Sequence, residues 1–167
     1  MHLPTQELSQ SSATAKYLKF NLLADMTALL PITQLAAVLK VEATHITAIP
    51  HLPAWVIGVY NWRGEVLWIV DMGHLLGGIP WYQQTILPTH YQTLILEQSE
   101  SETSEQQHIG LVVTQVEGIE SLSLDSIQSP VAISESLVPF LRGYWLEDNG
   151  DMLMLLDSLA IFSHMPE

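Results

Sequence analysis

Hydrophobic and polar residues alternate over short stretches of this chain, and turn-forming residues separate one stretch from the next. In residues 17–23, Leu18 and Phe20 alternate with polar neighbours, which is the period of a half-buried strand. Further strands are predicted at residues 91–98 and 108–122. Because the apolar runs are short and frequent, the pattern favours a sheet-rich fold.

Two tight hairpins are predicted from dipeptides that lie between apolar runs. Arg63-Gly64 separates the two halves of one hairpin, and residues 141–157 alternate around Asn149-Gly150. An Asn-Gly pair suits the positive φ angles of a type I′ turn, so we expect that turn in the second hairpin.

Three other segments are less regular. Residues 28–41 fit both a helical stripe and a strand, and the local pattern does not decide between them. Two prolines favour an extended connection and then a short helical turn at residues 53–57. The polar, acidic residues 99–107 are expected to form a solvated loop.

Many short strands and only brief helices indicate an all-β fold with short helices, a barrel or sandwich rather than a parallel α/β sheet. Residues 1–15 are rich in Ser, Thr and Gln and lack periodicity, so we expect a disordered tail. Residues 16–167 are expected to form a single domain.

Composition narrows the possible partners and the compartment. The chain has 167 residues, 48% hydrophobic, with a formal net charge of −13 and no cysteine. The negative charge argues against nucleic acid, and the missing thiols exclude disulfides and thiolate metal sites. The N-terminus does not resemble a signal peptide, and no run of about 18 apolar residues suits membrane insertion. We therefore expect a cytoplasmic protein.

The sequence offers little for catalysis. Its seven histidines do not have zinc-motif spacing, and no nucleophile elbow, phosphate-binding loop or dinucleotide fingerprint is present. Most of the histidines are expected at the surface. Asp71 and Asp157 each end an apolar strand before a predicted short helix, at residues 72–78 and 158–162. They are either a carboxylate pair or two helix caps, and capping is the better interpretation. No enzyme activity, metal or cofactor is predicted.

Residues 46–77 resemble the CheW-like coupling proteins of bacterial chemosensory systems. The likeness extends in order over residues 16–162, and it is most specific around the N-x-R-G hairpin. It is carried by Pro50, Pro53, Gly58, Val59, Asn61, Arg63, Gly64, Ile69, Asp71, Leu75, Leu76 and Gly77.

This resemblance implies a fold, a role and partners. The family fold is a pair of interlocked five-stranded SH3-like β-barrels. The implied role is a non-catalytic adaptor that joins a CheA-type histidine kinase, through its regulatory domain, to the tip of a methyl-accepting receptor. Such a protein works in the cytoplasm, at membrane receptor arrays, through its partners. The implied partner-binding residues are Arg63, Asn61, Gly58, Val59, Leu35 and Val38.

Three positions depart from the family pattern. Ala37 stands where a glutamate is common, Trp68 where proline is common, and Trp62 where an aliphatic residue is usual. The variant around residues 28–35 resembles branches linked to pilus motility or phototaxis. From its residues alone, Arg63 is either a solvated turn residue or held out to meet a partner. The resemblance implies that it is a partner contact or a pin that holds the binding groove in shape. A small-ligand-binding barrel and an interaction domain of another pathway are the alternative functions.

Overall fold

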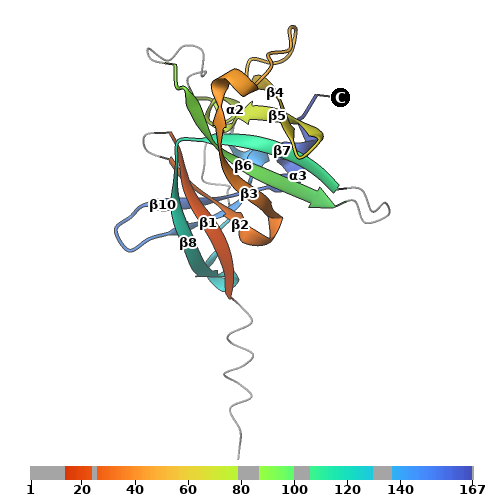
Figure 1. Cartoon of the computed structure of the whole chain (residues 1–167). Helices are drawn as coiled ribbons and strands as arrows, with labels where there is room; N and C mark the ends of the chain where they lie inside the picture. Colours follow the sequence, from red (N-terminus) through yellow and green to blue (C-terminus); the bar gives the residue numbers. More distant parts are fainter. Residues whose placement is uncertain (1–13, 24–25, 79–86, 100–105, 130–136, 167) are drawn as a thin grey trace, which may run out of the picture.

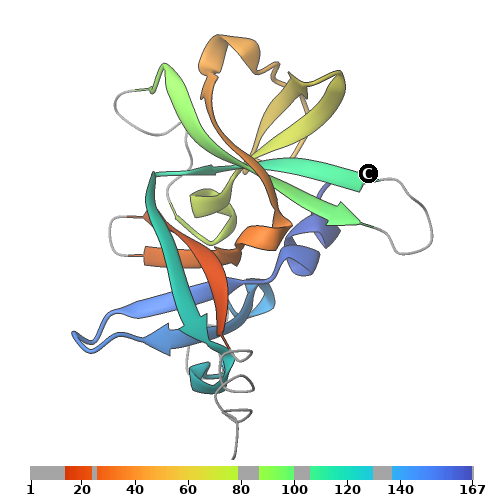
Figure 2. The same cartoon turned by 60° about the horizontal axis from the view of Figure 1, so that its bottom comes forward.

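The computed structural model describes residues 14–23, 26–78, 87–99, 106–129 and 137–166. These residues form two five-stranded sheets, which occupy the lower and upper halves of the molecule in Figures 1 and 2. In spatial order, the first sheet contains β8 (Gln115–Ser123), β1 (Thr14–Leu23), β2 (Met26–Pro31), β10 (Met152–Leu156) and β9 (Leu141–Leu146). The second sheet contains β3 (Leu35–Glu42), β6 (His90–Ser99), β7 (Gln106–Val113), β5 (Glu65–Asp71) and β4 (Val56–Trp62).

The chain interlocks the two sheets. It starts in the first sheet with β1 and β2, builds the whole second sheet, and returns to the first sheet at β8. The ambiguous segment at residues 28–41 is therefore two strands, β2 and β3, separated by the 3-10 helix Ile32–Gln34. The strands predicted within residues 108–122 are β7 and β8, which belong to different sheets.

One buried core joins the sheets. Side chains of β1 and β2 pack in the same cluster as those of β5, β6 and β7. The cluster also takes up residues of α2 (Met72–Leu75) and α3 (Ser158–Ser163). Its fully buried members include Phe20, Leu30, Val70, Met72, Leu94, Leu111 and Ile161. The two sheets consequently share this central cluster, and each sheet also has a smaller buried cluster of its own. The smaller clusters are Tyr17, Leu29, Trp145, Leu153 and Leu155 in the first sheet, and Ile57, Ile69 and Tyr91 in the second.

Both sheets contain the same local arrangement, a 3-10 helix followed by a single β-bridge. After β3, the 3-10 helix Ala43–His45 turns the chain so that Thr47 pairs with Val59 of β4. After β8, the 3-10 helix Leu124–Ser126 brings Gln128 against Tyr144 of β9 in the same way. Each bridge has two backbone hydrogen bonds, of 2.9 Å at Thr47 and of 2.8 and 3.0 Å at Gln128.

A glycine makes each bridge possible. A Cβ atom on Gly58 would lie 2.3 Å from the Thr47 carbonyl oxygen, and one on Gly143 would lie 2.7 Å from the Gln128 carbonyl oxygen. Real Cβ atoms do not approach backbone so closely, so each bridge requires a residue without a side chain. The predicted five-stranded units are confirmed as sheets. In the described residues only these single bridges, and no full ladders, link their edge strands.

The two aspartates at strand ends are helix caps. The Asp71 carboxylate accepts the His74 amide of α2 at 3.2 Å. The Asp157 carboxylate accepts the Leu159 and Ala160 amides of α3 at 3.1 and 3.4 Å. Both use the free N–H groups of a first helical turn, as the capping interpretation predicted.

The second hairpin does not have the predicted type I′ turn. Gly150 has a φ of 91°, but Asn149 does not have a positive φ. The Gly150 amide donates instead to the Glu147 carbonyl at 2.9 Å, and the Asn149 side chain accepts the Asp151 amide at 2.9 Å. These side-chain and backbone bonds favour a longer connection in which only the glycine is left-handed.

Other predicted boundaries also need correction. The helical turn at residues 53–57 is shorter than predicted, because the Val56 amide already closes a turn onto the Pro53 carbonyl at 3.0 Å and β4 begins there. The tail prediction is wrong for residues 14–15, which are part of β1, and residues 1–13 lie outside the described residues. The predicted acidic loop is likewise strand at Ser99, Gln106 and Gln107; residues 100–105 lie outside the described residues.

Candidate partner-binding site

The β4–β5 hairpin ends in a tight two-residue turn. Its tip, residues 61–65, has Arg63 and Gly64 at φ angles of 53° and 84°. Positive φ at both central positions is the geometry of a type I′ turn, which matches the twist of the flanking strands. The Asn61 side chain accepts the Gly64 amide at 3.0 Å and closes the turn. This geometry leaves the Arg63 side chain exposed at the tip.

Arg63 lies over an aromatic ring. The guanidinium carbon is 4.8 Å from the centroid of the Trp62 ring, which is cation–π geometry. Among the described residues, the guanidinium has no carboxylate within ion-pair distance. The planar group is therefore oriented by the ring while its donors stay available.

A partly buried histidine, His108, supports the tip. The His108 and Trp62 rings are in edge-to-face contact, with 5.1 Å between their centroids. His108 Nδ1 lies 2.6 Å from a Glu65 carboxylate oxygen, and Nε2 lies 3.3 Å from a Glu97 carboxylate oxygen. Its side chain is 11% exposed, so His108 is an exception among the described histidines, most of which are exposed as predicted.

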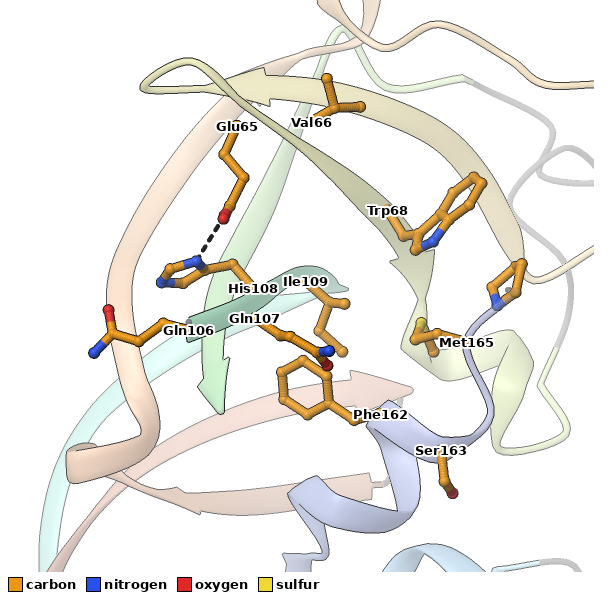
Figure 3. A pocket seen from close by; sticks show the side chains of 11 residues that line it. Glu65, Val66, Trp68, Gln106, Gln107, His108, Ile109, Phe162, Ser163 and Met165 are labelled. Atoms are coloured by element: carbon orange, nitrogen blue, oxygen red, sulfur yellow. Dashed lines mark hydrogen bonds and ion pairs between the residues drawn. The ribbon is translucent and has the colours of Figure 1, made fainter. Parts of the chain in front are cut away.

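A pocket of about 470 Å³ lies beside this cluster, between β5, β7 and the chain that follows α3. Figure 3 shows Glu65 and His108 at one end of the pocket and the apolar side chains of Trp68, Phe162 and Met165 at the other. The pocket therefore combines an apolar wall with a charged rim that continues into the hairpin tip.

The six candidate residues fall into three places. Asn61 and Arg63 lie together at the exposed tip. Gly58 is buried against Thr47, and Val59 is half-buried beside it on β4. Leu35 and Val38 lie on β3, the strand at the opposite edge of the second sheet.

The two residues on β3 differ in their surroundings. Leu35 is half-buried and packs against the shared core. Val38 is 44% exposed and contributes apolar surface. Ala37 lies between them, half-buried, next to an irregularity in the pairing with β6. The second sheet therefore offers one charged end and one apolar edge.

Sequence reasoning missed the support beneath the tip. Glu65, Glu97 and His108 come from three strands and meet only because of the strand register, in which Glu97 faces His108. The bulk of Trp62 was the one signal of this arrangement in the sequence.

The described residues show no group of three or more His, Cys, Asp or Glu side chains arranged to hold a metal ion. Among the described residues, no helix has the length and apolar character needed to cross a membrane.

Comparison with known families decides the relationship. The profile of the CheW-like domain matches residues 16–165, which include both sheets and the hairpin tip. The chain belongs to the CheW-like domain family. The resemblance inferred from the hairpin residues is thereby confirmed.

Two CheW relatives are similar in sequence. One is a probable chemotaxis protein CheW of Rhizobium etli, 35% identical over 121 residues, which are 72% of this chain and 71% of the relative. The other is the chemotaxis protein CheW of Rhizobium meliloti, 35% identical over 120 residues, which are 71% of this chain and 70% of the relative.

A solved CheW structure has the same fold. The scaffolding protein TtCheW from Thermoanaerobacter tengcongensis superposes with a TM-score of 0.69 at 23% identity, covering 86% of this chain and 88% of that one. The likeness supports the architecture of two interlocked five-stranded sheets.

Proposed function

We propose that this chain is a non-catalytic chemotaxis adaptor. In this proposal it joins a methyl-accepting receptor to a CheA-type histidine kinase through the kinase's regulatory domain. It works in the cytoplasm and reaches membrane receptor arrays only through these partners. Membership of the CheW-like domain family over residues 16–165 supports the proposal. Each sheet is proposed to act as one barrel-like subdomain of the adaptor.

The observation that carries the proposal is the pre-oriented arginine at the hairpin tip. Arg63 is exposed, lies over Trp62, and has no ion-pair partner among the described residues. A guanidinium presents a planar fork of donors that suits carboxylate or carbonyl oxygens. We propose that it contacts acceptor oxygens at the tip of a receptor helical hairpin, with Asn61 keeping the turn in shape.

The remaining candidates supply apolar contact or support. Val38 offers exposed surface on β3, next to the half-buried Leu35, and Val59 lies on the outer strand of the hairpin. Gly58 holds the hairpin against Thr47, so its proposed part in binding is to fix the position of β4. Simultaneous binding of receptor and kinase would let receptor packing shift the kinase between active and inactive populations.

Arg63→Ala tests the proposal. Affinity for a receptor-tip fragment should fall by about ten- to a hundred-fold, since a hydrogen bond to a charged group contributes about 1.5–3 kcal/mol. The fold should lose only the cation–π contact, about 0.5–1 kcal/mol, or roughly 1–4 °C in Tm. Isothermal titration and thermal unfolding measure the two effects.

The matched control is Arg142→Ala, which removes an exposed arginine from β9 in the other sheet. It should leave affinity for the receptor-tip fragment unchanged. Equal loss of affinity in both variants would show that the change in net charge, and not a contact of Arg63, weakens binding. Unfolding of Arg63→Ala would show that Arg63 stabilises the fold, and it would remove the proposed contact.

A further inference from the structure

We propose that His108, carrying protons on both ring nitrogens, is the positioning residue for the Arg63 contact. This inference rests on the proposed function, in which Arg63 binds a partner. His108 itself is largely enclosed, with 11% of its side chain exposed, and acts through Trp62 and Glu65. The proposal names a residue outside the N-x-R-G hairpin as a determinant of how that hairpin is presented.

His108 contacts both sides of the hairpin neck. Trp62 and Glu65 are register partners that flank the Arg63-Gly64 turn. The imidazole meets the Trp62 ring edge-on and the Glu65 carboxylate at 2.6 Å. Figure 3 shows this Glu65–His108 contact at the rim of the pocket. A rotation of the hairpin about its neck would disturb both contacts together.

Glu97 fixes the ring from the opposite side. It is the register partner of His108 across the β6–β7 ladder, and its carboxylate lies 3.3 Å from Nε2. One imidazole thus connects the hairpin strands β4 and β5 with β6 and β7. Such a cross-strand anchor lowers the freedom that the tip would otherwise lose on binding.

The two carboxylates around the imidazole favour a ring that carries protons on both nitrogens. An ionised carboxylate only accepts hydrogen bonds, and a neutral imidazole donates only one. A neutral ring would therefore turn a lone pair toward Glu65 or Glu97. The imidazolium donates to both, and the 2.6 Å contact has the length of a charge-assisted bond. Because the side chain is 11% exposed, water has little access to replace either partner.

The charges of this cluster balance around Trp62. Glu65 on β5 and Glu97 on β6 are the carboxylates that face His108, and Arg63 lies on the Trp62 ring. The two carboxylates are balanced by the imidazolium and the guanidinium. Among the described residues, however, the guanidinium forms no direct ion pair. The histidine thereby pairs with the two partly exposed glutamates and leaves Arg63 for the acceptor oxygens of a partner.

The first test is spectroscopic and needs no partner. In the full chain, nitrogen-15 NMR at neutral pH should show both His108 ring nitrogens in the protonated form. His108→Gln should shift the Trp62 indole N–H signal and speed amide hydrogen exchange at residues 61–65. A ring with one unprotonated nitrogen would overturn the charge assignment. Unchanged exchange and an unchanged indole signal would overturn the positioning role.

Binding supplies the second test. His108→Gln should weaken binding of the receptor-tip fragment by about two- to ten-fold, the factor expected when one pre-ordered side chain becomes free. Glu97→Gln keeps the shape of the side chain and removes its charge, so it should also weaken binding of the receptor-tip fragment. This variant replaces His108→Gln if the latter fails to fold. Full affinity in the folded variant would contradict the inference.

Glu42→Gln is the matched control. Glu42 pairs with His45 and His90 at 3.2 and 3.7 Å on the same sheet, but all three side chains are about half exposed or more. This variant should change neither the exchange at the tip nor the binding. If Arg63→Ala leaves receptor binding intact, the proposed function fails, whereas the NMR and exchange results still decide the role of His108.

Discussion

Gly58→Ala should destabilise the protein through a single steric contact. The added Cβ would lie 2.3 Å from the Thr47 carbonyl oxygen and 2.9 Å from Cγ2 of Ile46. Ordinary van der Waals contact begins near 3.4 Å, so the Thr47 backbone would have to move by about 1 Å. That movement breaks the bridge in which Thr47 and Val59 exchange two hydrogen bonds of 2.9 Å.

The cost follows from these contacts. Two hydrogen bonds at about 1 kcal/mol each and about 1–3 kcal/mol of overpacking give a loss of about 3–5 kcal/mol. For a chain of this size, the loss corresponds to a fall in Tm of roughly 6–20 °C. Urea unfolding gives the free energy, and thermal unfolding followed by circular dichroism gives Tm.

Two further variants separate the causes. Gly143→Ala meets the Gln128 carbonyl in the equivalent bridge and should cost a similar amount. Gly64→Ala has no atom within 4 Å of its new Cβ and suffers only from its φ of 84°, at about 1–2 kcal/mol. A Gly58→Ala variant no less stable than Gly64→Ala would refute the steric argument.

Lys19→Met should lower the free energy of unfolding by about 1–2 kcal/mol, because it removes the cation that three partly exposed glutamates share at 3.3–3.7 Å. The loss should be smaller at high salt, which screens these pairs. Urea unfolding at two salt concentrations measures the loss, and an equal loss at both would contradict the prediction. Burial raises the pKa of Tyr17 against an opposing effect of Arg142, and burial followed by Asp71 raises the pKa of Tyr91. A raised pKa means that folding favours the neutral phenol, so this stability is complete below the ordinary value of 10.0 and is lost as pH rises through the folded values. Tyr91→Phe should reduce the loss of stability between neutral and strongly alkaline pH, and an unchanged alkaline profile would contradict the assignment.

Local signals predicted the hairpins and caps because each depends on residues close in sequence. Arg63-Gly64 between apolar runs is enough to place a two-residue turn, and Asp71 before a short helix is enough to place a cap. The Asn149-Gly150 turn was mispredicted because Asn149 bonds to the Asp151 amide, a choice between local partners that composition does not reveal.

The sheet assignment and the support of the site depend on distant residues. β7 and β8 are nearly continuous in sequence but lie in different sheets, because β8 pairs with β1 about a hundred residues earlier. The ion-pair contacts of His108 likewise depend on Glu65 and Glu97, which are brought beside it by two separate ladders. The periodicity of one strand does not predict its register with a strand that is distant in sequence.

The structure places the candidate residues, while their part in binding stays a prediction. Asn61 and Arg63 do share an exposed tip. Gly58 was grouped with them because of the hairpin pattern. The close approach of Thr47 shows that a glycine is needed there for packing, which the sequence alone does not reveal. Leu35 and Val38 lie on a different strand, so any joint role with Arg63 requires a partner that reaches two edges of the second sheet.

As the proposed adaptor, one chain binds kinase and receptor at the same time through two separate surfaces. Transient signalling contacts bury less than about 1,200 Å² in total, so we expect micromolar affinities. Isothermal titration of the full chain with a kinase regulatory domain, followed by a receptor-tip fragment added to the preformed pair, measures this directly. We expect a ternary complex in which the second partner binds without displacing the first. Strict competition, or no binding of either partner, would contradict it.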